Sequence, residues 1–257
     1  MQVVILAWGL GTRLSEETIV KPKPMVEIGG KPILWHIMKN FSYYGHKEFI
    51  ICLGYKGYYI KEWFANYFLH NSDVTIDTKN NKIEVHNNNC EDWKVTLVDT
   101  WDNTMTWGRI KKIIDSGYIK WGEFLMTYGD GVGNVDINNL TKFHKKHWKL
   151  ATITRVQPEW RFWKLIMDWD NIIKFWEKLD NKDAWINWWF MVLNRKIVDY
   201  IKWDEISLEK YPLETLSNEW QLVGYAHEWF WKPMDTIRDR NELEDMWNSW
   251  NAPWKLC

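Results

Sequence analysis

The sequence predicts an α/β protein built on a doubly wound, mostly parallel sheet. In the first part of the chain, apolar and β-branched runs alternate with amphipathic stretches of helical length. Strands that alternate with helices form βαβ units, and such units build parallel sheets. The first strand, near residues 2–7, leads directly into a loop that contains Gly9 and Gly11. We expect further strands near 48–53, 94–99, 123–128 and 150–156, and helices near 32–44, 57–69, 105–116 and 136–147.

The second half of the chain is richer in strand patterns and has shorter helices. It ends with an amphipathic segment near residues 236–248 that predicts a C-terminal helix. A small hairpin is expected near 74–86, where the polar run K-N-N separates two strand-like runs. No linker, repeat or low-complexity segment divides the sequence, so we expect a single domain over residues 1–257. In the second half, strands are expected near 162–168, 171–175, 186–193 and 221–226.

Composition argues against several classes of function. The 257 residues carry a formal net charge of −1, without the strongly basic balance typical of nucleic-acid or membrane-surface proteins. No run of about 18 apolar residues occurs, and the N-terminus lacks the basic n-region of a signal peptide. Cys52, Cys90 and Cys257 lie far apart and form no CxxC pair, which disfavours disulfides and structural zinc. We therefore expect a cytoplasmic protein that binds neither nucleic acid nor membrane.

The loop after the first strand has the features of a phosphate-binding turn. Gly9 and Gly11 permit positive φ, so backbone N–H groups can point toward an anion. Arg13, and later Lys23 in the run K-P-K-P-M, add positive charge beside the loop. The Walker A pattern GxxxxGK[ST] is absent, and Gly9-Leu10-Gly11 lacks the third glycine of a dinucleotide fingerprint. The loop thus predicts a polyanion site of another kind.

Two carboxylates follow predicted strands in the two halves of the chain. Asp130 lies at the end of the strand-like run 124–131, and Asp235 lies just before the last helix. Ligands of open α/β sheets bind at the carboxyl ends of the strands, where Asp130 is expected. Mg²⁺ prefers oxygen ligands and commonly takes one or two carboxylates together with phosphates. The alternative for each residue is a helix N-cap or a turn position.

The pattern L-A-x-G-x-G-T-R-L followed by K-P-K-P-M resembles the signature of sugar-phosphate nucleotidyltransferases. These enzymes join a nucleoside triphosphate to a sugar 1-phosphate and release pyrophosphate. Each further matching segment is weakly specific, but their order and spacing are highly specific. They extend the resemblance over essentially the whole chain, at residues 15–18, 54–57, 99–101, 105–109, 127–131, 177–178, 186–190 and 231–236.

The resemblance implies a Rossmann-like nucleotidyltransferase fold with a β-rich sugar-binding half. It is closest to the family members that use CTP and α-D-glucose 1-phosphate, and it implies Mg²⁺ as the cofactor. It also implies a homo-oligomer, the usual state in this family. One alternative is a nucleotidyltransferase for another base or sugar, with UTP or dTTP as the donor. Another is a sugar- or nucleotide-binding protein on the same fold that performs no reaction.

The resemblance also assigns roles in the reaction. Arg13, Lys23 and Asp130 would act in catalysis, with Lys23 neutralising charge at the α-phosphate. Asp130 and Asp235 would hold Mg²⁺. The remaining residues of the nucleotide end would line its pocket, cradle the triphosphate or select the base. The nucleotide-binding set is Leu6, Ala7, Trp8, Gly9, Leu10, Gly11, Thr12, Arg13, Thr104, Arg109 and Gly129.

Three residues of the second half are assigned to the sugar phosphate. Glu177 would accept hydrogen bonds from sugar hydroxyls, Lys178 would hold the phosphate, and Asn187 would bind the sugar. The alternative for Glu177, Lys178 and Arg109 is an exposed side chain without a part in the reaction.

The chain contains 22 tryptophans, several of them at positions that require a turn or an open cleft. The family comparison predicts glycine at many of these positions, which we call the glycine-expected tryptophans. They are Trp8, Trp101, Trp107, Trp121, Trp148, Trp160, Trp163, Trp169, Trp176, Trp188, Trp189, Trp203, Trp220, Trp229 and Trp250. The remaining tryptophans look natural: Trp35, Trp63, Trp93, Trp185, Trp231, Trp247 and Trp254.

We hypothesise that most glycine-expected tryptophans arise from decoding. Some bacterial lineages read UGA as glycine, and a translation table that reads UGA as tryptophan would give this pattern. Glycines encoded by GGN would survive as glycine. The rival explanations are real substitutions in a degenerate, inactive homologue and a deliberately altered chain.

Overall fold

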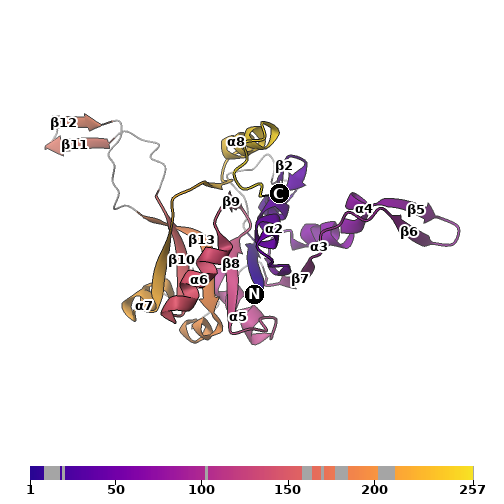
Figure 1. The fold of residues 1–257 in the computed structure, drawn as a ribbon, viewed down its shortest axis with the longest axis horizontal. Coiled ribbons are helices and arrows are strands. Elements are labelled where there is room, and N and C mark those ends of the chain that lie inside the picture. Colours follow the sequence, from indigo (N-terminus) through magenta and orange to yellow (C-terminus); the bar gives the residue numbers. More distant parts are fainter. Residues whose placement is uncertain are drawn as a thin grey trace.

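A seven-stranded sheet forms the centre of the computed structural model, in the order β14-β10-β13-β8-β1-β4-β7 (Figure 1). β13 runs against its neighbours β8 and β10, and the other six strands are parallel to one another, so the predicted mostly parallel sheet is confirmed. The described residues are 1–8, 18, 21–101, 104–157, 164–168, 171–176, 185–201 and 212–256. The strands are β1 (Val3–Ala7), β4 (Glu48–Leu53), β7 (Lys94–Asp99), β8 (Glu123–Tyr128), β10 (Ala151–Val156), β13 (Ile186–Asn194) and β14 (Leu222–His227).

Helices cover both faces of this sheet. Because side chains alternate along a strand, β1 contributes to two cores. Val3, Ile5 and Ala7 pack in one hydrophobic cluster, and Val4 and Leu6 pack in another. Residues of α2 (Ile33–Tyr43) and α6 (Ile137–His147) join the first cluster, and residues of α5 (Thr106–Asp115) join the second. The doubly wound arrangement is therefore confirmed.

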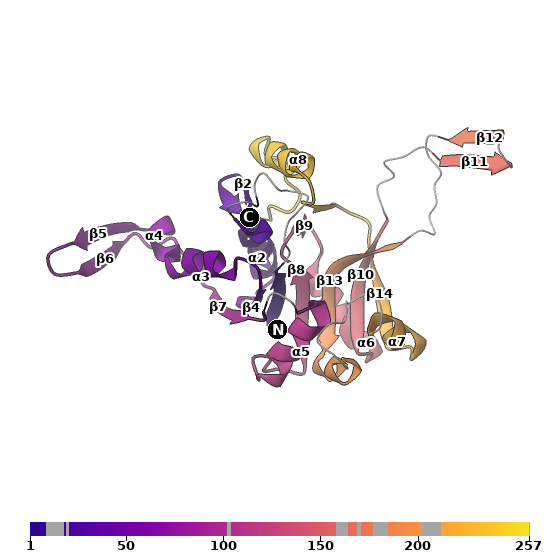
Figure 2. The ribbon, with the colours of Figure 1, turned by 180° about the vertical axis from the view of Figure 1, so that it is seen from behind.

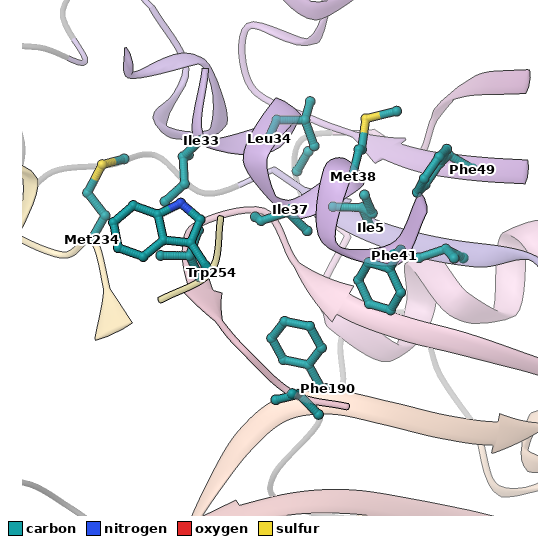
Figure 3. Close-up of a cluster of buried hydrophobic side chains, with 14 of the residues drawn as sticks. Ile5, Ile33, Leu34, Ile37, Met38, Phe41, Phe49, Phe190, Met234 and Trp254 are labelled. Atoms are coloured by element: carbon teal, nitrogen blue, oxygen red, sulfur yellow. The ribbon is translucent and has the colours of Figure 1, made fainter. Parts of the chain in front are cut away.

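The first cluster contains most of the large side chains of α2 (Figure 3). They share this cluster with Ile5 and Phe49 of the sheet, and Phe41 is the labelled α2 side chain that lies toward Phe190. The rings of Phe41 and Phe190 stack with centroids 5.4 Å apart. Since Phe190 lies on β13, this contact joins the two halves of the chain around one core.

The remaining helices agree with the predicted pattern except in one place. The helix expected near 57–69 is two helices, α3 (Gly57–Ala65) and α4 (Tyr67–Asn71). Asn66 separates them because its φ of −102° and ψ of 13° depart from helical values. The other helices are α7 (Pro212–Asn218) and α8 (Ile237–Asn248).

Two hairpins project from opposite sides of the body (Figures 1 and 2). The expected hairpin near 74–86 is β5 (Asp73–Asp77) paired with β6 (Lys82–His86). The strands expected near 162–168 and 171–175 are β11 (Lys164–Asp168) and β12 (Asn171–Trp176). This second pair forms its own two-stranded sheet, outside the central one.

Two short strand pairs were not predicted, because two- and three-residue strands leave no periodic signal. β2 (Glu27–Ile28) pairs with β3 (Lys31–Pro32), and β9 (Gly131–Gly133) pairs with β15 (Trp231–Pro233). Among the described helices, none is long and apolar enough to cross a membrane.

The buried side chain of His36 predicts acid sensitivity of the fold. Its Nε2 lies 2.8 Å from the Ile28 carbonyl oxygen, and burial lowers its pKa from 6.5 to about 4. Between these values the unfolded chain binds the proton more readily than the folded chain, so stability falls as pH falls through this window. We expect His36 to contribute at most about 1.4 kcal/mol of lost unfolding free energy per pH unit.

Urea unfolding between pH 4 and 7 measures this contribution. His36→Gln should flatten the dependence of the unfolding free energy on pH. His86→Gln, in the exposed β5–β6 hairpin, is the matched control and should leave the slope unchanged. An unchanged slope in His36→Gln would contradict the assignment.

Candidate active site

The carboxyl ends of β1 and β8 approach each other closely at one edge of the sheet. The N–H of Gly129, just after β8, donates to the Leu6 carbonyl oxygen at 3.0 Å. A Cβ at residue 129 would lie 3.3 Å from that oxygen and 3.2 Å from Pro24 Cγ. Glycine therefore permits the close approach expected at this position. Leu6 and Ala7 are buried beneath this edge.

The K-P-K-P-M run places Lys23 at the same edge. Lys23 begins a short 3₁₀ helix that ends at Met25, and prolines flank it on both sides. Proline fixes φ near −65°, which restricts the backbone on either side of this lysine. The buried Lys23 Nζ donates to Asp130 Oδ2 at 2.8 Å and to Asp235 Oδ1 at 2.7 Å. Three groups from distant segments thus converge on one point.

Pairing of β9 with β15 brings the two carboxylates together. In this antiparallel pair Gly131 lies opposite Pro233, so the residue before β9 and the region after β15 lie side by side. The Met234 N–H donates to the Asp130 carbonyl oxygen at 2.8 Å. The N-cap of α8 is Thr236, so the helix-cap alternative for Asp235 is wrong.

Electrostatics favour a charged Lys23. Burial by itself lowers the pKa of Lys23, but attraction to and hydrogen bonding with Asp130 and Asp235 outweigh burial and raise that pKa above its usual value. The lysine therefore stays protonated at neutral pH and supplies a fixed cation between the two carboxylates.

The donor set at this point fits a divalent cation. Asp130 and Asp235 are partly exposed, and both already hold a cation, the Lys23 ammonium. Hard oxygen ligands of this kind suit Mg²⁺, which usually completes its coordination with water and substrate phosphates. Among the described residues no cluster of three or more histidine, cysteine or acidic side chains could hold a metal alone.

Arg109 lies beside the carboxyl ends of β1 and β4, near Trp8 and Leu53. It is fully buried, at 0% exposure, and NH1 donates to the Leu53 carbonyl oxygen at 2.9 Å and to Thr100 Oγ1 at 2.6 Å. Its guanidinium lies 4.5 Å from the Trp8 ring centroid. The exposed alternative for Arg109 is therefore wrong. A Cβ at Gly54 would lie 2.9 Å from Arg109 NH1, so that close contact depends on glycine.

Thr100 and Thr104 lie beside Arg109 and Lys112. Thr104 is buried, and its hydroxyl accepts a hydrogen bond from Lys112 Nζ at 2.6 Å. Thr100, a contact of Arg109 that the sequence did not predict, donates to the Leu53 carbonyl oxygen at 2.7 Å. The only sequence signal for Thr100 is its position directly after the strand near 94–99.

A small cavity opens beside the carboxylates. Its volume is about 190 Å³, and its lining includes Asp130, Asp235, Trp188 and Trp189. Trp188 packs on Trp231 with centroids 4.8 Å apart, and the Trp189 ring lies 4.7 Å from that of Tyr128. Ligand pockets usually measure about 300–1,000 Å³, so this cavity is small for a sugar phosphate.

The predicted sugar-phosphate residues are placed only in part. Asn187 lies on β13, and its Oδ1 is buried without a hydrogen-bond partner among the described residues. Such an acceptor is available to a ligand hydroxyl. The other predicted site residues lie outside the described residues, and their roles stay predictions: Gly9, Leu10, Gly11, Thr12, Arg13, Glu177 and Lys178.

Comparison with known proteins identifies the family. The nucleotidyl transferase family matches residues 2–218. The chain belongs to this family. Enzymes of this family act on a nucleoside triphosphate and a sugar phosphate, and they generally use a divalent metal. The resemblance to sugar-phosphate nucleotidyltransferases is therefore confirmed.

Individual relatives cover the full length of this nucleotidyltransferase. It is 55% identical over 99% of both chains to a glucose-1-phosphate cytidylyltransferase of Salmonella typhi. It is 39% identical over 100% of both chains to a probable glucose-1-phosphate cytidylyltransferase of Bacillus subtilis. The crystal structure of HddC from Yersinia pseudotuberculosis has a similar fold, with a TM-score of 0.68, 24% identity, and 96% and 99% of the chains covered.

Proposed function

We propose that this nucleotidyltransferase transfers a cytidylyl group from CTP to α-D-glucose 1-phosphate and releases CDP-glucose and pyrophosphate. The observation that carries the proposal is the convergence of Lys23, Asp130 and Asp235 at the edge of the sheet. The relatives named cytidylyltransferases, which match the chain from end to end, support the choice of base and sugar.

In this reaction a phosphate oxygen of the sugar phosphate attacks the α-phosphorus of CTP. The bond to the pyrophosphate oxygen breaks, and negative charge grows on the leaving group. The Lys23 ammonium stabilises this charge, because it is a preorganised cation in a partly buried site. Asp130 and Asp235 would hold Mg²⁺, which supplies further positive charge to the phosphates when bound. The buried position of Lys23 keeps its charge poorly screened by water.

Further residues are assigned to the triphosphate and to the sugar phosphate. We propose that Gly11, Thr12 and Arg13 cradle the triphosphate. Asn187 presents its unpaired oxygen to a sugar hydroxyl. We assign Glu177 to further sugar hydroxyls and Lys178 to the sugar phosphate. The chain acts as one domain over residues 1–257 in the cytoplasm, and it assembles as a homo-oligomer.

CTP should be used well ahead of UTP, dTTP, ATP and GTP. A pocket that hydrogen-bonds one base edge leaves buried polar groups unpaired with the wrong base, and such losses discriminate strongly. Pyrophosphate release with glucose 1-phosphate as the acceptor and each nucleotide as the donor gives the kcat/KM ratios. Comparable kcat/KM for CTP and for UTP or dTTP would favour the alternative base. Binding of CTP without release of pyrophosphate would favour the non-catalytic alternative.

A further inference from the structure

α2 and α5 are each followed by a glycine with a left-handed backbone. After α2, the Gly45 N–H donates to the Ser42 carbonyl oxygen at 2.9 Å, and the His46 N–H donates to that of Phe41 at 3.0 Å. After α5, Gly117 makes the corresponding bond to Ile114 at 3.0 Å. This is the Schellman motif, whose left-handed residue is usually glycine. Gly45 and Gly117 have φ of +84° and +74°.

α7 and α8 end in the same motif with tryptophan at the glycine position. The Trp220 N–H donates to the Ser217 carbonyl oxygen at 3.0 Å, and the following Gln221 N–H donates to that of Leu216 at 2.7 Å. The Trp250 N–H likewise donates to the Trp247 carbonyl oxygen at 3.2 Å. Trp220 and Trp250 have φ of 58° and 60°. A residue with a Cβ is strained at such φ, and a bulky one is an outlier.

The left-handed backbone is confined to one group of tryptophans. Trp101 and Trp148 also have positive φ, of 66° and 57°. All four left-handed tryptophans belong to the glycine-expected set. The remaining tryptophans all lie within the described residues, and none of them has positive φ.

Within the described part of the chain, strong exposure occurs only among the glycine-expected tryptophans, although Trp107 and Trp188 of that set are buried. Trp148 and Trp220 are 92% and 78% exposed, and every other strongly exposed tryptophan among the described residues is also glycine-expected. The remaining tryptophans are buried or half-buried. Two of them form hydrogen bonds: Trp35 Nε1 donates to Tyr67 Oη at 3.0 Å, and Trp93 Nε1 donates to Ser42 Oγ at 3.1 Å. Trp35 and Trp93 are integrated into the fold, whereas Trp148 and Trp220 are not.

Tryptophan in place of glycine at positions 188 and 189 explains the small volume of the cavity beside the carboxylates. Trp188 and Trp189 line it directly, and Trp189 lies where the pairing of β13 with β10 is irregular. Such β-bulges often contain glycine. Loss of both indoles would enlarge the cavity next to Asp130 and Asp235. This part of the argument rests on the proposed function, whereas the backbone argument does not.

We infer that the glycine-expected tryptophans are glycine in the protein that its native cell makes, because UGA specifies glycine there. The sugar-phosphate cleft of that protein is then open at positions 188 and 189. The remaining tryptophans are true tryptophans, encoded by UGG. Positive φ at positions 101, 148, 220 and 250 supports the assignment independently of the family comparison. The cavity lined by Trp188 and Trp189 supports it at those two positions.

Codons and peptide masses test the inference without any folding requirement. The gene should carry UGA at Trp101, Trp148, Trp220 and Trp250, and UGG at Trp35 and Trp93. Peptides of the protein purified from its native cells should have the masses expected for glycine at the UGA positions. UGG codons at the four left-handed positions, or peptide masses that contain tryptophan there, would overturn it.

Thermal melting of recombinant variants tests the backbone argument. Trp220→Gly and Trp250→Gly should each raise Tm by about 2–4 °C, because glycine adopts the left-handed conformation without strain. Trp220→Ala and Trp250→Ala remove the same indoles but keep a Cβ, so their Tm should stay below that of the glycine variants. Trp93→Gly is the matched control and should lower Tm. A glycine variant that melts no higher than its alanine counterpart would contradict the inference.

A second experiment tests the inference even if the protein with all 22 tryptophans does not fold. The starting protein carries glycine at every glycine-expected position, and tryptophan is restored at 220 or at 250. Each restoration should lower Tm, and an unchanged Tm would count against the inference. In the same background, restoring tryptophan at 188 and 189 should reduce pyrophosphate release from CTP and glucose 1-phosphate at least tenfold. If the Tm changes at 220 and 250 are as expected but the all-glycine protein releases no pyrophosphate, the proposed function is overturned and the inference about glycine is not.

Discussion

Asp130→Ala is expected to lower kcat at least a hundredfold while the protein stays folded. Asp130 accepts a hydrogen bond from the Lys23 ammonium and, with Asp235, forms the carboxylate pair suited to a divalent cation. Metal charge on a transferring phosphoryl group contributes several kcal/mol to the transition state. A hundredfold loss corresponds to about 2.7 kcal/mol. Steady-state pyrophosphate release at saturating CTP measures the effect.

Two further variants make this measurement specific. Asp130→Asn keeps the shape of the side chain but loses its charge, so it should be nearly as inactive as the alanine variant. Asp92→Ala removes a carboxylate that is 91% exposed and should leave kcat unchanged. Similar melting temperatures for all variants would show that the fold is intact. A loss below tenfold in Asp130→Ala would remove Asp130 from the proposed metal ligands.

Lys23→Ala is expected to lower kcat more than it raises the KM for CTP. Negative charge on the leaving pyrophosphate is greatest in the transition state, so a cation placed there acts mainly on kcat. Removal of one such preorganised group commonly costs about a hundred- to a thousandfold in kcat. Lys21, two residues earlier, pairs with Glu27 at 2.5 Å and provides the control. Lys21→Ala should change kcat little.

The effect of Mg²⁺ on Tm tests the role of Lys23 independently of activity. Without the ammonium, Asp130 and Asp235 repel each other, and a divalent cation relieves that repulsion. Mg²⁺ should therefore raise the Tm of Lys23→Ala more than that of the unmodified protein. An effect of Lys23→Ala on KM alone would assign Lys23 to ground-state binding of CTP.

Periodicity and strand-end position carried much of the prediction. Apolar runs predicted β1, β4 and β8, because buried parallel strands are apolar on both faces. Asp130 was recognisable because it follows one of these strands and the carboxyl ends of parallel strands share an edge. Helix boundaries were predicted to within one or two residues for α2, α5, α6 and α8.

Local patterns could not predict features that depend on distant partners. The β9–β15 pair is too short to leave a periodic signal, yet it places Asp235 beside Asp130. Arg109 is polar and lies on a helix, so its sequence position was equally compatible with exposure. Only tertiary structure shows that its guanidinium is buried against the Leu53 carbonyl oxygen and Thr100.

The sequence by itself determined the order of the main strands and helices, the doubly wound fold class and the residue types for phosphate chemistry. These properties follow from local periodicity and from short motifs, which are encoded in neighbouring residues. Tertiary structure alone decided that Lys23 lies between two carboxylates and that four tryptophans have left-handed backbones. The Lys23 contacts join residues more than a hundred positions apart, and the left-handed φ values follow from how each turn closes in space.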